Sequence, residues 1–170
     1  FVYGWGRGSY LGSASSDVAI TSPIVVANGL SFSQISAHGR YAAGVTASGS
    51  IWTWGYNYGS TVVINGTLGT TTLYQSIPVS IVGSTSYSQI NAANVMLLAR
   101  GYNGTLHYCG QKFGTLSAQT SLIAAPEFSG HSFVKVAGGN FYMAGLKQNG
   151  EVYAAGGFAS GVSFSPATLI

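Results

Sequence analysis

The residues of this chain that could donate or accept protons in a reaction are few and widely spaced. The sequence contains three carboxylates and three histidines, namely Asp17, Glu127, Glu151, His38, His107 and His131. General acid–base catalysis needs two such groups held near the same substrate atoms. The three carboxylates fall in different parts of the chain, and no Gly-x-Ser-x-Gly motif supports a Ser/His/Asp arrangement, although the many serines leave that arrangement open. We therefore predict that the chain is not an enzyme.

The candidate metal ligands do not form a site pattern either. Zinc sites pair His or Cys at short intervals, and the three histidines share no such spacing with the single cysteine, Cys109. Calcium would need clustered carboxylates in one loop. We expect no metal and no cofactor, with Cys109 as a buried, inert thiol and His107 as a replacement for a strand aromatic.

Composition narrows the class of protein. The chain has 170 residues, enough for one domain with a core. Only 5% of its residues are charged, against roughly 25% in an average soluble domain, whereas Gly, Ser, Thr and Asn are abundant. This composition favours strands and turns. The six cations are scattered, so we expect no nucleic-acid partner, and polar residues interrupt every apolar run before the ~20 residues that a membrane span needs. Phe1 stands in place of an initiator methionine, which indicates a processed chain or a piece of a longer one.

One short pattern recurs and organises the chain. A turn that runs into an aromatic strand ending on glycine occupies residues 47–55, 102–110 and 148–156, and residues 2–6 form a copy without the turn. Ser-Gly or Asn-Gly between apolar runs predicts a two-residue hairpin in which both central residues have positive φ. The turn glycines Gly49, Gly104 and Gly150 are separated by 55 and 46 residues.

Each repeat is long enough for four short strands. In the first unit we expect them at about residues 24–27, 31–37, 41–46 and 50–55, followed by a variable loop over 56–76. A period near 50 residues with four strands per unit is typical of a β-propeller blade; a β-solenoid or a chain of hairpins is the alternative. The prediction is an all-β chain of four-stranded antiparallel blades. It forms a single repeat domain over 1–170, with units at about 2–50, 51–105 and 106–151 and a partial unit at 152–170.

Residues 37–55 resemble the signature of the regulator of chromosome condensation repeat. They combine small residues, a histidine, alternating apolar positions, a glycine turn and an aromatic strand that ends Trp54-Gly55. The Trp is kept at Trp5 but replaced by Cys109 and Ala155, and the family's usual histidine is replaced at three positions, by Tyr41, Met96 and Tyr142. The resemblance implies a ring of about seven blades, of which this chain would hold three and fragments of two more. It also implies that Trp5, Trp54 and Cys109 are buried between blades.

Both ends of the chain carry short uncharged segments. We expect the first to be the last strand of a blade and the second to be the first strand of another, both unpaired and available for assembly. These predicted assembly strands are Val2, Tyr3, Gly4, Trp5 and Gly6 at one end and Ala167, Thr168, Leu169 and Ile170 at the other. Free strand edges invite pairing with another chain. The expected partner is another copy of the chain, in a homo-oligomer or filament, or the rest of a longer propeller.

Three further features bear on function. Asn65 and Asn103 begin glycosylation sequons, and Tyr56, Asn57 and Tyr58 form a possible ligand loop. The favoured interpretation is a self-associating structural protein of an extracellular or cell-surface assembly, because low charge reduces the cost of packing identical subunits. One alternative is a lectin-like propeller that binds glycans or proteins. A second alternative, implied by the family resemblance, is an exchange-factor or scaffold propeller that acts on a small GTPase.

Overall fold

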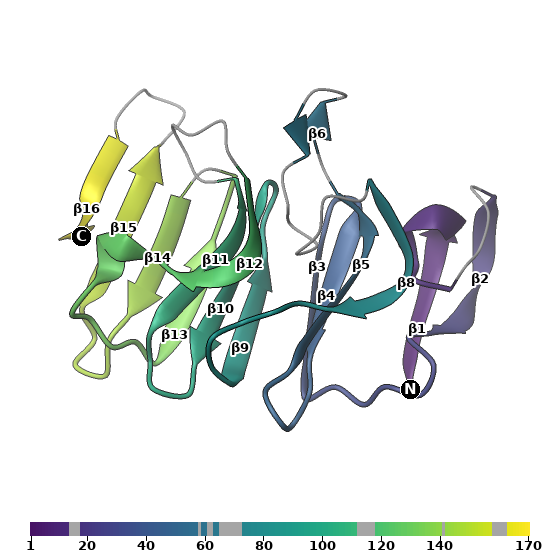
Figure 1. Cartoon of the computed structure of the whole chain (residues 1–170), viewed down its shortest axis with the longest axis horizontal. Coiled ribbons are helices and arrows are strands. Elements are labelled where there is room, and N and C mark those ends of the chain that lie inside the picture. The colour runs from purple at the N-terminus through teal and green to yellow at the C-terminus, as the bar shows by residue number, and fades with distance from the viewer. Residues whose placement is uncertain are drawn as a thin grey trace.

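The computed structural model consists of short antiparallel β-sheets placed side by side in chain order (Figure 1). The structure describes residues 1–13, 18–57, 59–60, 63–64, 73–111, 118–140, 142–157 and 163–170. Within these residues the only helical elements are two 3-10 turns, η1 (Gly8–Tyr10) and η2 (Pro126–Phe128). No helix long and apolar enough to cross a bilayer occurs in this described part of the chain.

Three sheets have four strands each, and we call them the first, second and third blade. The first blade contains β3 (Gln34–His38), β4 (Tyr41–Val45), β5 (Ile51–Tyr56) and β8 (Tyr74–Ser80). The second contains β9 (Tyr87–Ala92), β10 (Met96–Gly101), β11 (Leu106–Gln111) and β12 (Ala118–Ala124). The third contains β13 (Lys135–Gly138), β14 (Tyr142–Leu146), β15 (Val152–Gly157) and β16 (Ser163–Leu169). Within each blade the four strands pair antiparallel in chain order, which confirms the predicted fold class.

Two smaller sheets complete the described structure. β1 (Val2–Arg7) pairs with β2 (Ala19–Val26), and we call this pair the half-blade. β6 (Gly59–Ser60) and β7 (Val63–Ile64) form a short ribbon within the segment of chain that connects β5 to β8. Residues 24–26 belong to β2 of the half-blade, because β2 extends to Val26. The segment expected as the first strand of the first unit is therefore the outer strand of the preceding sheet, and the sheets are out of phase with the repeat units read from the sequence.

The hairpin turns differ from the predicted type. Gly49, Gly104 and Gly150 have φ of 85°, 84° and 90°, but Ser48 and Asn103 do not share the positive φ that a two-residue turn requires of both central residues. Instead the Gly49 N–H donates to the Thr46 carbonyl at 3.0 Å, so that each glycine follows a tight turn as a left-handed residue. The asparagine serves the turn through its side chain: Asn103 Oδ1 accepts the Thr105 N–H at 3.1 Å.

The closing glycine of each repeat is a β-bulge. Gly6, Gly55, Gly110 and Gly156 have φ between 101° and 123°, and the pairing of each third strand with its fourth shifts register at this glycine. A Cβ atom on Gly55 would lie 2.5 Å from the Arg40 carbonyl oxygen. The positive φ explains the glycine in all four copies, and at Gly55 the close approach of the Arg40 carbonyl is a second reason.

The core lies between successive blades. One apolar cluster joins Tyr41, Ala43, Val45 and Ile51 of the first blade to residues of the second blade that include Ile90 and Cys109. A second cluster joins the second blade to the third through residues such as Leu98, Phe133, Val136 and Met143. Each sheet thus buries its faces only through its neighbours, as the repeat length predicts.

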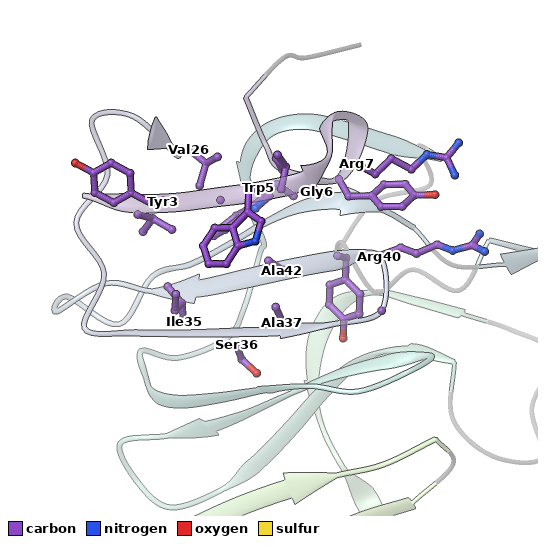
Figure 2. Close-up of a pocket in the computed structure, with 17 residues that line it drawn as sticks. Tyr3, Trp5, Gly6, Arg7, Val26, Ile35, Ser36, Ala37, Arg40 and Ala42 are labelled. Atoms are coloured by element: carbon purple, nitrogen blue, oxygen red, sulfur yellow. The ribbon is translucent and has the colours of Figure 1, made fainter. Parts of the chain in front are cut away.

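Burial confirms two of the three predicted buried positions. Trp54 is 3% exposed and Cys109 is fully buried, but Trp5 is 65% exposed, so its predicted burial is wrong. Side chains at this position pack toward the sheet that precedes them: a Cβ atom on Gly12 would touch the Trp54 ring, and Cys109 packs on the first blade. Trp5 lies on β1 and lines the open space between β1 and β4 (Figure 2), where no further strand of the described chain pairs with β1 to cover its ring.

The terminal strands are also placed differently from the prediction. Residues 2–6 belong to β1, which occupies the place of a third strand and pairs with β2 along one edge. Residues 167–169 belong to β16, the fourth strand of the third blade, where Leu169 pairs with Tyr153, and the Ile170 N–H donates to the Val152 carbonyl at 3.0 Å. Neither terminal segment is wholly unpaired, and the C-terminal one does not begin a new sheet.

Candidate functional site

A groove of about 530 Å³ separates the half-blade from the inner strands of the first blade. Its walls come from β1 on one side and from β3 and β4 on the other, and Figure 2 shows the side chains that line it. Ile35 of β3 projects into this space and is 54% exposed. An exposed isoleucine within the first strand of a blade indicates a surface that lacks its usual neighbour.

The closed interfaces show what that neighbour is in the other blades. Gln34 on β3 holds the backbone of Ile90 on β9: its Nε2 donates to the Ile90 carbonyl at 3.2 Å, and its Oε1 accepts the Ile90 N–H at 3.0 Å. Gln89 on β9 holds Val136 on β13 in the same way, with both bonds at 3.0 Å. We call this arrangement the amide clamp, because one side-chain amide satisfies both backbone groups of a single residue in the next blade.

A second contact accompanies each amide clamp. Ser36 Oγ accepts the Ala92 N–H at 2.9 Å, and Asn91 Oδ1 accepts the Gly138 N–H at 2.8 Å. These acceptors stand two residues after the clamping glutamines, on the same side of the first strand of their blades. The first strand of each blade is thus fixed to the first strand of the next by three side-chain hydrogen bonds.

Tyr41 adds a contact between the first and second blades. Its hydroxyl lies 2.8 Å from the Ala93 carbonyl oxygen and 2.7 Å from the Met96 carbonyl oxygen, and it accepts the Ala93 N–H at 3.0 Å. Burial raises the pKa of this hydroxyl well above its usual value of 10.0. The group therefore stays protonated and donates one hydrogen bond while it accepts another.

An arginine–tyrosine cluster lies at one mouth of the groove. The Arg7 guanidinium lies 5.1 Å from the centre of the Tyr10 ring, and the Arg40 guanidinium lies 5.4 Å from the centre of the Tyr56 ring. Tyr56 also contacts Tyr10 at 6.0 Å and Tyr74 at 4.9 Å between ring centres. Figure 2 shows Arg7 and Arg40 extending in the same direction at this end of the groove. Cation–π contacts of this kind orient guanidinium groups at a surface.

The cluster marks one end of the sheets, which we call the loop face. The third strand of each blade ends there, as does β1 of the half-blade, and the connections to the fourth strands begin there (Figure 1). The hairpin between β3 and β4 also reaches this face, where the Tyr56 N–H donates to the Arg40 carbonyl at 2.9 Å. Two exposed cations and three tyrosine rings therefore gather on a face whose connections vary in length.

The structure separates the residues of the predicted ligand loop. Tyr56 belongs to the arginine–tyrosine cluster, the Asn57 side chain is fully buried, and Tyr58 lies outside the described residues. The sequon residue Asn65 also lies outside the described residues. Asn103 is exposed, and its side chain is engaged in its hairpin turn.

The titratable residues singled out in the sequence do not converge. His107 is buried against the Tyr87 ring, 5.3 Å between ring centres, and burial lowers the pKa of its imidazole. Glu151 pairs with Lys147 at 3.2 Å in a turn of the third blade, whereas Asp17 lies outside the described residues. Across the described ranges, no three His, Cys, Asp or Glu side chains are grouped so that they could hold a metal ion.

The amide clamp was missed by sequence reasoning although its signal is present. Ser33-Gln34-Ile35 and Ser88-Gln89-Ile90 occupy the same place in two repeats and mark the period. A glutamine repeated beside an isoleucine indicates a shared hydrogen-bonding role, but the partner backbone is a strand more than 45 residues away. Only the stacking of the blades reveals it.

Three solved structures have the same fold. Human WBSCR16 matches with a TM-score of 0.75 and 18% identity over 91% of this chain and 42% of that chain. Prp20p from Saccharomyces cerevisiae matches with a TM-score of 0.73 and 21% identity over 91% and 41%. Yeast RCC1 (Prp20) bound to Kap60 matches with a TM-score of 0.68 and 18% identity over 91% and 39%. No protein-family profile and no curated protein matches the sequence.

These likenesses confirm the regulator of chromosome condensation repeat fold. The chain spans about two fifths of the length of the solved structures that it matches. The Prp20p study describes binding to Gsp1p and histones, and the yeast RCC1 structure contains Kap60. Protein partners are therefore documented for proteins of this fold.

The same neighbours contradict the favoured interpretation of the sequence. Partners such as histones point away from an extracellular or cell-surface location and from a structural filament of glycoprotein subunits. Low charge and two sequons suggested that interpretation, but both features are also compatible with a propeller of another kind. The neighbours favour the second alternative, the exchange-factor or scaffold propeller.

Proposed function

We propose that this chain is a section of an RCC1-type propeller that acts as a docking scaffold for a protein of the small-GTPase class. The observation that carries the proposal is the likeness to Prp20p over 91% of this chain, since Prp20p is described as binding Gsp1p. The chain matches 41% of Prp20p, so a complete ring would need further blades. The scaffold would act by binding, without a catalytic acid, base or metal of its own.

The loop face offers the best docking surface on the described chain. Arg7 and Arg40 are exposed there, each over a tyrosine ring. Arginine and tyrosine are enriched at protein interfaces, where a guanidinium can bind a carboxylate with two parallel hydrogen bonds. The surface therefore fits a protein partner that presents carboxylates.

Binding to immobilised Gsp1p, measured by biolayer interferometry, tests this proposal. We expect the chain to bind, and we expect the joint replacement Arg7→Ala and Arg40→Ala to weaken binding by about tenfold or more. The matched control replaces Lys135 and Lys147 by alanine, which removes the same charge away from the loop face and should leave binding unchanged. If the arginine and the lysine double variants weakened binding equally, the loss would be due to net charge and not to the loop face. Absence of binding by the parent chain would overturn the proposal.

A further inference from the structure

We propose that the groove receives a two-stranded β-hairpin from the remainder of the propeller, and that an amide clamp on the first strand of this hairpin recognises β3. The inference rests on the larger propeller of the proposed function. It does not depend on any partner at the loop face.

The pairing of β1 indicates a hairpin as the occupant. In the three complete blades the strand that corresponds to β1 has a partner on both edges: β5 lies between β4 and β8, and β11 and β15 are placed likewise. In the described part of the chain, β1 pairs only with β2. Two further strands, joined by a turn, would complete the half-blade, and they would occupy the space beside β3 that the groove leaves open.

The hydrogen-bonding requirement of β3 specifies the first strand of that hairpin. In repeat position Ile35 corresponds to Ile90 and Val136, and Ala37 corresponds to Ala92 and Gly138. Those four residues have their edge-facing backbone groups bound by the preceding blade. Ile35 and Ala37 are instead exposed on the wall of the groove.

A glutamine followed two residues later by a short acceptor satisfies this requirement. Ile35 needs a donor for its carbonyl and an acceptor for its N–H, and a side-chain amide supplies both in one planar group. Ala37 needs an acceptor for its N–H, which Ser or Asn provides in the closed interfaces. Addition of the hairpin would also cover the Ile35 side chain, as Ile90 is covered between the first and second blades.

A second copy of this chain does not meet the requirement. Its third blade already has four strands, so it has no spare hairpin. The residues of β13 that correspond to the clamp are Lys135 and Ala137, both exposed. An ammonium group donates but cannot accept the Ile35 N–H, and alanine has no acceptor for the Ala37 N–H. The occupant of the groove is therefore a segment whose side chains differ from those of β13 in the third blade.

The chain contains a hairpin that can serve as the probe. Residues 84–105 include β9 and β10 with Gln89 and Asn91, and Thr105 directly precedes the third strand of the second blade. A copy of 84–105 placed before Val2, in place of Phe1, would therefore enter β1 as β10 enters β11. A control chain carries Gln89→Lys and Asn91→Ala in the copy only, which reproduces the side chains of β13.

Amide hydrogen exchange at Ile35 and Ala37, followed by NMR, is the measurement. We expect exchange at both amides to slow by about tenfold or more in the extended chain and to return toward the parent rate in the control. A synthetic peptide of residues 84–105, added to the parent chain, provides a second measurement if the extended chain does not fold. It should shift the Ile35 and Ala37 resonances more than a peptide with the two substitutions.

Equal protection by both hairpins would overturn the amide clamp as the basis of recognition. Absence of protection by either hairpin, in the extended chain and as a peptide, would overturn the groove as a docking site. Neither result depends on Gsp1p, so a failure here and a failure of loop-face binding are distinguishable.

Discussion

The first blade is covered by a neighbouring blade on one side and borders an open groove on the other. On the side of the second blade, the inner strands are closed by the Gln34 clamp, and Ile90 is 1% exposed. On the side of the half-blade, Ile35 occupies the same repeat position and is 54% exposed. Both isoleucines lie in the first strand of a complete four-stranded sheet. Burial in this fold is therefore decided by the adjacent sheet and not by the sheet to which a residue belongs.

Replacing these two isoleucines gives the largest expected difference. Ile90→Ala should lower the free energy of unfolding by about 2 to 5 kcal/mol, because it leaves a cavity in a closed interface. Ile35→Ala should change it by no more than about 0.5 kcal/mol, because the side chain already meets solvent. Urea unfolding of both variants makes the comparison. Similar losses in both would show that the two sides of the first blade are equally closed in solution.

The amide clamp permits a second matched pair at one repeat position. Gln89→Leu keeps much of the side-chain volume but leaves the Val136 N–H and carbonyl without the clamp, and we expect a loss of about 1 to 3 kcal/mol. Lys135→Leu changes the corresponding residue on the third blade, which faces no further blade in the part of the chain that the structure describes, and should alter stability by about 0.5 kcal/mol or less. Thermal unfolding of the two variants is the measurement. A neutral Gln89→Leu would mean that water replaces the clamp without cost.

Acid should lower the folding stability through His107, at the interface between the first and second blades, and we expect this effect to be smaller than those of the substitutions above. His107 shares a sheet face with Cys109, on the side that packs against the first blade. Burial lowers the pKa of His107 below its ordinary value of 6.5, so the unfolded chain binds the proton more readily than the folded chain. The stability due to the neutral imidazole is present above about pH 6.5 and is lost as the pH falls through and below that value.

The variant His107→Leu isolates this contribution. We expect the fall in Tm between about pH 7.5 and about pH 5.5 to be smaller in the variant than in the parent chain. The Tm at the higher pH reports any change in packing separately. An unchanged fall would assign the acid sensitivity to other groups.

The sequence predicted what repeats and missed what depends on neighbours. Glycine turns and aromatic strands recur at a fixed phase, so the blades and the burial of Trp54 and Cys109 could be inferred. Residues 24–27 were assigned to the wrong sheet because a variable loop separates every fourth strand from its third, and periodicity does not show across which loop a strand pairs. The exposure of Trp5 was also missed, because it depends on the open space between β1 and β4, which periodicity does not show.

The candidate site could be predicted only in part. Tyr56 was singled out as a loop aromatic, but its contacts with Tyr10 and Arg40 join segments more than 15 residues apart in sequence. Gln34 and Gln89 were visible only as markers of the period. Their function depends on the distance between two stacked strands, which no pattern within a single strand contains.

The amide clamp has a consequence for how such a chain can diverge. It binds the backbone of the next blade, so the side chain of the clamped residue is not read: one clamp holds Ile90 and the other holds Val136. A duplicated blade would therefore bring the same backbone hydrogen bonds to its neighbour, and later exchanges between buried apolar side chains at the clamped position would keep those bonds. Exchange of one apolar residue for another between the copies within this chain is then tolerated at the junctions themselves, as Ile90 and Val136 show.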